Sequence, residues 1–187
     1  MPRQGVSARQ AETVARLVEA AEAELRDRGG EGVSVRSVAR RAGVSSGTAY
    51  TYFASKGHLF AELFQRHLGG LGGDVDQLDS DDPVVRVQAV TDKVTGLLIE
   101  FPALADVVTP ALLGADPDVA RVRLLIGADI MERFERAVGP GADPILVEAL
   151  TQCFLGGLLS AGMGLTTYAQ LASRMRQMVA TIMRGNV

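Results

Sequence analysis

The sequence is poor in the residues that build disulfides, metal sites and nucleophilic centres. Its 187 residues include no tryptophan, one cysteine and two histidines. The lone Cys153 excludes an internal disulfide framework and fits the reducing cytoplasm, where we expect the chain to act. His58 and His67 are expected on one helix with opposite orientations, so they cannot share a metal ion. We expect His58 on the surface, no metal site and no cofactor.

Catalytic and membrane signals are also missing. We find no Ser–His–Asp set, no paired carboxylates and no phosphate-binding glycine loop, so we expect a protein that is not an enzyme. The longest apolar run, residues 153–165, is interrupted by glycines and falls short of the roughly 20 residues of a membrane span. Arg3 and Arg9 are followed by no apolar stretch, so we expect no secretory signal.

Charge is distributed unevenly along the chain. The formal net charge is −3, but residues 1–70 hold ten Lys and Arg against seven Asp and Glu, whereas residues 71–187 hold nine against fifteen. A basic N-terminal part on an acidic body indicates a polyanionic partner for the N-terminal part. Chance variation in composition is the alternative.

Helix signals run through almost the whole chain, and no useful stretch alternates apolar and polar residues as a strand does. We therefore predict an all-α fold of about nine helices. A stretch rich in Gly and Asp, residues 69–82, is the one plausible boundary, which gives a domain of residues 1–68 and a domain of residues 69–187. Helix starts are expected where a capping side chain stands before the helix, at Ser7 (with Gln10), Ser34, Ser45, Ser55, Asp82-Pro83, Asp116-Pro117 and Asp143-Pro144.

The stretch AGVSSGTAYTYF, residues 42–53, falls between two short helices. We predict a first helix over 34–42, a turn over 43–45 and a second helix over 46–53. A helix, a short turn containing glycine and a second helix form the arrangement that places the second helix in the major groove of DNA. Ala49 and Phe53 are expected to face inward. Gly47, Thr48, Thr51 and Tyr52 are then left on the outer side. Small residues there would let the backbone come close to DNA, and the free N–H groups of the helix N-terminus favour phosphate.

The motif closely resembles the DNA-binding domain of TetR-type bacterial transcription regulators. The resemblance covers about residues 10–65, a third of the chain, and fits the rest only in length and helix content. The residues that carry it are Ala39, Ala42-Gly43-Val44-Ser45, Gly47-Thr48, Tyr50, Tyr52-Phe53 and Lys56.

The resemblance implies a role in DNA binding for ten positions. Arg36 is placed to reach a base edge, since Arg suits bidentate contact with guanine. Short side chains on the second helix indicate that DNA shape and the N-terminal Arg3 and Arg9 add specificity. Ordinary packing of the tyrosines and a solvated Lys56 are the alternatives for single residues. Base-reading positions are Ser46, Gly47 and Thr48, and backbone-contacting positions are Ser34, Ser45, Tyr50, Thr51, Tyr52 and Lys56.

Two apolar seams near the C-terminus predict helix–helix packing. The resemblance implies a homodimer through the last two helices, arranged as a four-helix bundle; a purely intramolecular core is the alternative. Small residues at every fourth position would let two helices approach closely. The seams are Leu146, Leu150, Cys153 and Gly157, and Leu171, Met175, Met178 and Ile182, and the small residues are Gly156, Ser160 and Gly164.

The resemblance also implies a small-molecule pocket in the middle helices, and the residue types there suit an apolar effector. Simple core packing is the alternative for each residue. Pro102 and Pro110 are expected to bracket a separate segment, residues 103–109, that links the pocket to the DNA-binding part. The expected pocket residues are Phe101, Leu104, Val108, Met131, Phe134, Phe154 and Met163, with Thr109, Gln152 and Tyr168 as polar candidates.

Two functions follow. The first is a DNA-binding transcription regulator, a repressor that a small apolar ligand releases from a palindromic operator of double-stranded DNA. The second is a dimeric structural DNA-binding protein without an inducer.

Overall fold

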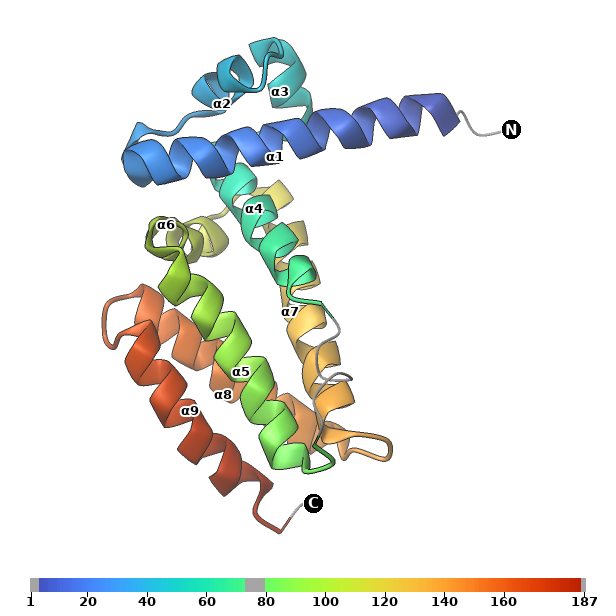
Figure 1. Cartoon of the computed structure of the whole chain (residues 1–187), viewed down its shortest axis with the longest axis vertical. Coiled ribbons are helices and arrows are strands. Elements are labelled where there is room, and N and C mark those ends of the chain that lie inside the picture. Colours follow the sequence, from blue (N-terminus) through green and yellow to red (C-terminus); the bar gives the residue numbers. More distant parts are fainter. Residues whose placement is uncertain (1–3, 73–79, 186–187) are drawn as a thin grey trace.

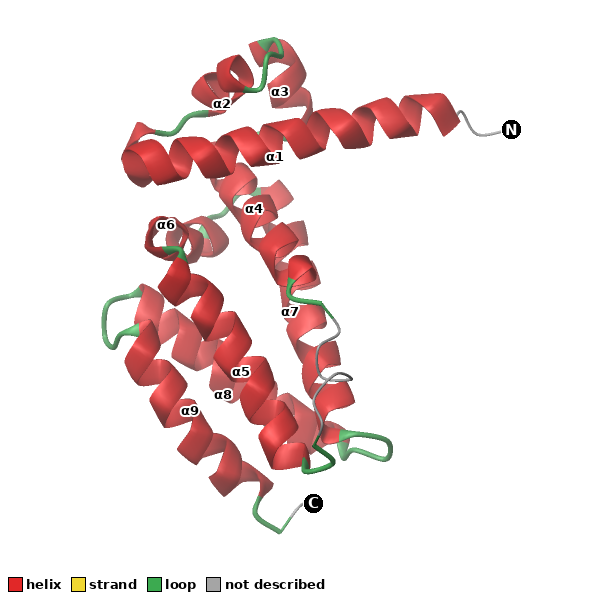
Figure 2. Cartoon of the chain, in the orientation of Figure 1, coloured by secondary structure: helices red, strands yellow, loops and turns green. Residues whose placement is uncertain are grey.

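The computed structural model describes residues 4–72 and 80–185, with side chains described from residue 9 onward. The described residues form helices joined by short loops and contain no strand, which confirms the all-α prediction (Figure 2). The nine helices are α1 (Gln4–Gly32), α2 (Val35–Arg41), α3 (Ser46–Tyr52), α4 (Lys56–Gly70), α5 (Pro83–Glu100), α6 (Pro102–Leu113), α7 (Pro117–Val138), α8 (Pro144–Gly162) and α9 (Tyr168–Met183).

Local capping chemistry sets most helix starts. At each of the three Asp-Pro pairs the Asp carboxylate accepts an N–H from the first turn, at 2.8 Å for Asp82, 2.9 Å for Asp116 and 2.9 Å for Asp143. The proline that follows has its φ already set for the first helical position. Phe101 stands between α5 and α6, because the residue before a proline avoids helical geometry.

Two expected element boundaries differ from the structure, and the domain boundary is not tested. α1 begins at Gln4, so Ser7 lies inside the helix and is not its N-cap. Pro110 lies inside α6, so residues 103–109 are not a separate segment. A proline inside a helix removes one hydrogen bond, here to the carbonyl of Asp106 on the exposed side of α6. α4 continues to Gly70 and residues 73–79 lie outside the described part, so the domain boundary after residue 68 stays a prediction.

The helices form a small N-terminal head on a larger body (Figure 1). α1 lies across the top with α2 and α3 on one side of it, and α4 runs from this head down along α7. α6 lies beneath α1, and α5, α8 and α9 pack together in the lower part. α4 therefore belongs to both parts, since it contacts α1 in the head and α6 and α7 in the body.

Buried aromatic residues and one buried arginine hold the body together. Phe134 of α7 and Phe154 of α8 meet edge to face with ring centroids 5.8 Å apart, and both are fully buried. Arg133 is also buried and donates hydrogen bonds to the carbonyls of Leu68 (2.8 Å) and Gly72 (3.0 Å). A cation suits these carbonyls at the C-terminal end of α4. The far end of α4 is thereby fixed to α7.

The C-terminal seams pack α8 against α9 within the chain. A Cβ at Gly157 would lie 2.4 Å from the end of the Leu171 side chain, so any larger residue there would require Leu171 to shift. Further along, the Cys153 sulfur lies 3.7 Å from the Met178 sulfur, and burial raises the pKa of the Cys153 thiol. Residues of the two seams therefore contact each other within the chain. The outward side of α8 is a different face of that helix from its seam.

One described helix, α8, has the length and apolar composition of a membrane span, and α5 and α6 meet the same criterion only as a pair bent by 109°. α8 starts at Pro144, so its apolar stretch is longer than the run considered in the sequence. Core helices of soluble proteins have the same length and composition. Since α8 packs against α6, α7 and α9, this is weak evidence for a membrane segment.

Phe134→Ala should lower the free energy of unfolding by about 3–5 kcal/mol, because it removes a fully buried ring and leaves a cavity beside Phe154. Urea unfolding followed by circular dichroism measures the loss. Leu124→Ala on the exposed side of the same helix is the control and should change stability by less than about 0.5 kcal/mol. Equal effects of the two substitutions would contradict this account of the core.

Candidate DNA interface and adjoining cavity

The helix–turn–helix is built by two capping serines and a glycine turn. The Ser34 hydroxyl accepts the Ser37 N–H at 3.0 Å while the Ser37 hydroxyl accepts the Ser34 N–H at 3.0 Å, which closes a capping box at the start of α2. Gly43 ends α2 with φ +67°, a conformation that favours glycine. Ser45 then caps α3 by accepting the Thr48 N–H at 3.0 Å.

α3 presents one face to the head core and leaves the other open. Ala49 and Phe53 are buried, as the spacing predicts. Tyr52, expected on the outer side, is half-buried and packs against the core, whereas Tyr50 is exposed. Lys56 is half-buried, with its ammonium 5.7 Å from the centre of the Phe60 ring. The other expected DNA-binding residues are exposed, namely Ser34, Arg36, Ser45, Ser46, Gly47, Thr48 and Thr51.

Two threonine hydroxyls of α3 already have partners at the start of the helix. The Ser45 and Thr48 hydroxyls lie 2.8 Å apart, and the Thr51 hydroxyl donates to the Gly47 carbonyl at 3.1 Å. These bonds hold the side chains close to the helix. Direct reading of bases by these hydroxyls would have to compete with the existing bonds, so backbone approach and apolar contact are the stronger means of recognition here.

Gly47 has no structural reason to be glycine. A Cβ built there would meet nothing closer than the Ser45 hydroxyl at 3.8 Å, and its φ is ordinary for a helix. Glycine inside a helix destabilises it relative to alanine. The absence of a side chain at this exposed position permits close approach of a partner from outside, which is what the DNA-binding prediction requires.

The arginines of α2 separate into free and paired groups. Arg41 is paired with Asp27 (2.6 Å) and Glu24 (3.3 Å), which raise its pKa and fix α2 to α1. Arg36 and Arg40 are exposed on one side of α2, and no ion pair of either occurs in the described part of the chain. Arg40 is a candidate phosphate contact that the sequence analysis missed; its spacing of one helical turn from Arg36 was the available signal.

The N-terminal arginines fit the prediction less well. Arg9 lies within α1 and its carbonyl accepts the Thr13 hydroxyl, so it is not part of a free arm. Arg3 lies outside the described residues. Base reading from an N-terminal arm therefore has no support from Arg9.

His58 is buried, and its expected surface position is wrong. Only 6% of the residue is exposed, because its ring packs edge to face on Phe53 and its Nδ1 accepts the Ala54 N–H at 3.3 Å. The ring thereby joins the end of α3 to the start of α4. Residues 4–72 and 80–185 contain no group of three His, Cys, Asp or Glu side chains that could hold a metal ion.

Three contacts join the head to the body. The Ser55 hydroxyl, which caps α4, also donates a short hydrogen bond to Asp116, which caps α7. This bond lowers the pKa of the Asp116 carboxyl, and the Asp118 N–H acts in the same direction. A Cβ at Gly30 would overlap Val107 of α6, so the end of α1 lies directly on the body.

The third contact is centred on Phe101, between α5 and α6. The guanidinium of Arg26 in α1 lies 3.9 Å from the centre of its ring, and His67 of α4 meets the ring edge to face at 5.8 Å. Phe101 is therefore held by two head helices and does not line the cavity described next. Because Arg26 of α1 and His67 of α4 both contact this ring, a shift of α6 would disturb its contacts with both helices.

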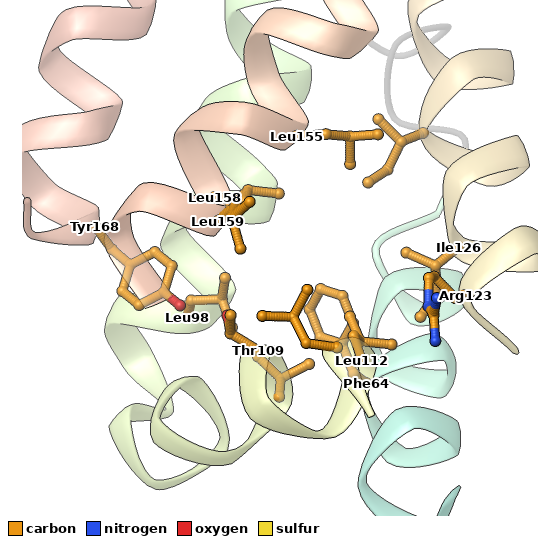
Figure 3. Close-up of a pocket in the computed structure, with 13 residues that line it drawn as sticks. Phe64, Leu98, Thr109, Leu112, Arg123, Ile126, Leu155, Leu158, Leu159 and Tyr168 are labelled. Atoms are coloured by element: carbon orange, nitrogen blue, oxygen red, sulfur yellow. The ribbon is translucent and has the colours of Figure 1, made fainter. Parts of the chain in front are cut away.

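An apolar cavity of about 210 Å³ lies in the body immediately below the head (Figure 3). α4, α5, α6, α7 and α8 and the first residue of α9 supply its wall. The wall is almost entirely aliphatic and aromatic, and its polar members are Thr109, Arg123 and Tyr168. The lining residues are Phe64, Leu98, Val108, Thr109, Leu112, Leu113, Arg123, Ile126, Ile130, Leu155, Leu158, Leu159 and Tyr168.

The structure brings few of the expected pocket residues to this cavity. Val108 lines it, and so do the polar candidates Thr109 and Tyr168. Met131 and Met163 are exposed by 43% and 60% and lie elsewhere, as does the exposed Gln152. The remaining expected residues are buried core outside the cavity wall, namely Phe101, Leu104, Phe134 and Phe154.

Tyr168 brings an uncharged hydroxyl to the cavity. Burial raises the pKa of its phenol, while the nearby Thr109 hydroxyl opposes that rise. The Tyr168 hydroxyl is shielded from solvent, but no protein group in the described part of the chain lies in normal hydrogen-bonding geometry to it. A buried hydroxyl without a good partner is costly, so an acceptor on a bound molecule would be favoured here.

Comparison with known proteins decides the family. The model of bacterial regulatory proteins of the tetR family matches residues 17–63, from α1 into α4. An uncharacterised HTH-type transcriptional regulator of Mycobacterium tuberculosis is 40% identical over 180 residues, which cover 95% of this chain and 83% of that protein. The chain belongs to the TetR family of bacterial regulatory proteins. It is a DNA-binding transcription regulator and not an enzyme.

Other TetR-family proteins share the sequence or the fold. The repressor KstR of Rhodococcus jostii is 31% identical over 115 residues, 61% of this chain and 54% of that protein. A TetR regulator from Rhodococcus sp. RHA1 has a TM-score of 0.80 at 23% identity, covering 96% of this chain and 100% of that chain.

Two further structures of this fold contain small molecules. FadR of Bacillus subtilis, in complex with stearoyl-CoA, has a TM-score of 0.59 at 18% identity and covers 88% of this chain and 96% of that chain. The SmeT–triclosan complex has a TM-score of 0.63 at 23% identity and covers 91% of this chain and 90% of that chain. At these identities the likeness extends to the fold alone.

Gly47→Ala should raise stability and weaken DNA binding at once. Alanine should stabilise α3 by about 0.5–1 kcal/mol, because nothing inside the chain opposes a methyl group there. The same methyl group would push DNA away and weaken binding by about tenfold or more. Thermal unfolding and fluorescence anisotropy with a selected DNA fragment measure the two effects. Gly96→Ala in α5, where a Cβ also meets nothing, is the control and should leave DNA affinity unchanged.

Arg36→Ala and Lys56→Ala should weaken DNA binding in different ways. Loss of Arg36 should cost about 1–3 kcal/mol and relax the preference at one base pair, as for a bidentate contact with guanine. Loss of Lys56 should weaken all sequences alike and reduce the salt slope of binding by about one. Binding measured over a salt series and a set of single-base variants separates the two. Arg121→Ala removes a cation of the body and is the control. If Arg36→Ala and Lys56→Ala change DNA binding only as Arg121→Ala does, both assignments are contradicted.

Proposed function

We propose that this TetR-family protein is a dimeric repressor that binds a palindromic operator and is released by a small apolar ligand. The observation that carries the proposal is the position of the cavity. Phe64 of α4 forms part of its wall, and the same helix begins at Lys56 beside the candidate DNA interface. A molecule that expands the cavity would therefore displace the helix that positions the head. The protein would act in the cytoplasm, where its DNA is.

The outward face of α8 supports the dimer. Ile145 is 69% exposed and Met163 is 60% exposed on this face, and Gly156 between them has open space around its Cβ position. Exposed apolar side chains around small residues favour packing against another helix. A second copy of α8 and α9 would complete a four-helix bundle. Two heads are needed for a two-fold operator, because each recognition helix reads one half-site.

The size of the cavity limits the ligand. A cavity of 150 Å³ lined by aliphatic and aromatic residues binds benzene. The cavity of about 210 Å³ therefore accommodates an apolar group of roughly eight to ten heavy atoms without rearrangement. Stearoyl-CoA and triclosan, bound by two proteins of this fold, are larger, so a ligand of that size would have to open the cavity.

The alternative of a structural DNA-binding protein has no use for such a cavity. The cavity is partly open to solvent and leaves apolar side chains of its wall without packing partners, which lowers stability. Its presence beside the head is explained if a ligand occupies it in one functional state.

Release is tested with a cavity-filling substitution. In vitro selection supplies the operator, and compounds are screened for a rise in melting temperature together with a fall in operator affinity. Leu158→Phe should keep operator binding but abolish the response to any such compound, because the larger ring occupies the cavity. Leu125→Phe, on the exposed side of α7, is the matched control. If compounds that fully occupy the cavity leave the operator affinity unchanged, the result would favour the structural alternative.

A further inference from the structure

Arg123 is the one charged residue in the described wall of the apolar cavity. One nitrogen of its guanidinium donates to the Gly114 carbonyl at 2.9 Å. No carboxylate of the described residues forms an ion pair with it, whereas Arg26, Arg41, Arg133 and Arg176 each have one. A guanidinium carries five N–H donors. Donors thus remain available at the edge of the cavity.

We propose that Arg123 binds an anionic group of the effector, so that the effector is a small apolar acid. The proposal rests on the effector role of the cavity proposed above. Figure 3 shows Arg123 on one side of the cavity and Tyr168 on the other, with leucine side chains between them. An apolar group fits between these ends, its acidic group pairs with Arg123, and a charge-assisted hydrogen bond of this kind is stronger than a neutral one.

The present partner of Arg123 connects the cavity to the head. Gly114 ends α6 and is followed closely by Asp116, which caps α7 and accepts the hydrogen bond from Ser55 of the head. An anion that draws Arg123 away from the Gly114 carbonyl frees this loop. The Ser55–Asp116 bond then loses the fixed position of its acceptor. Asp116 and Ser55 act as positioning residues, and α4 with Lys56 is released from its place on α7.

Matched probes with and without charge test the recognition of an acid. Octanoate and octanol, and phenylbutyrate and phenylbutanol, are titrated calorimetrically into the full chain. The wild-type protein should bind each acid about tenfold more tightly than its alcohol. Arg123→Gln should remove this preference and leave the affinity for the alcohols unchanged. Arg174→Gln, the same change at an exposed arginine of α9 outside the cavity wall, is the control and should keep the preference.

The outcomes separate this inference from the proposed function. Equal affinity for acid and alcohol in the wild-type protein, or a preference that survives Arg123→Gln, overturns the role of Arg123 and leaves the cavity as an effector site. Binding of none of the four probes overturns the effector site itself and this inference with it. Thermal unfolding of each variant shows that it is folded.

A second pair of variants tests the connection to the head. Asp116→Ser keeps an N-cap residue on α7 but is too short to reach Ser55, and Asp143→Ser makes the same change on α8, away from the head. Asp116→Ser should bind octanoate as the wild-type protein does, while the acid lowers its operator affinity by about threefold or less. Asp143→Ser should respond like the wild-type protein. A full response in Asp116→Ser would exclude the route through Ser55.

Discussion

The sharing of α4 between head and body is the constraint on which the rest of the structure depends. Its first turn, capped by Ser55, adjoins the recognition helix through the buried His58 ring, while Phe64 reaches the cavity wall. At its far end Arg133 holds the Leu68 carbonyl. A hydrogen-bonded helix tends to move as a unit, so the displacement proposed at the cavity would be transmitted to the head without any change inside the head.

The junction combines fixed and exchangeable contacts. Gly30 against Val107 and the rings around Phe101 are packed surfaces, which resist partial displacement because they lose contacts at once. The Ser55–Asp116 bond lies at a polar edge where water can replace either partner. The proposed regulation requires two arrangements of this junction, one with the polar bond formed and one with it open around the same packed surfaces. That is the bistability that a ligand-controlled regulator needs.

The sequence predicted the features that depend on neighbouring residues and missed those that depend on distant ones. Asp-Pro starts and serine caps are local, so the fold class, helix number and helix–turn–helix followed directly. Met131 and Phe134 are apolar and lie three residues apart, so helical spacing places them as neighbours on α7 and does not tell which of them another helix covers. In the structure Phe134 is fully buried, whereas Met131 is 43% exposed. The DNA-binding residues remain predictions that the exposed face of α3 supports.

Recognition of DNA and of ligand follows one physical pattern in this molecule. The Thr48 and Thr51 hydroxyls are hydrogen-bonded at α3 and Gly47 offers only backbone, so the predicted DNA contact would depend on shape and on a directional contact from Arg36. The cavity likewise offers aliphatic walls and one charged side chain, Arg123. A shape-selective surface with a single cation discriminates weakly among similar apolar molecules but strongly against those of the wrong charge. Under the two proposals, specificity in both sites would depend on few polar groups, and a change of one arginine would redirect either.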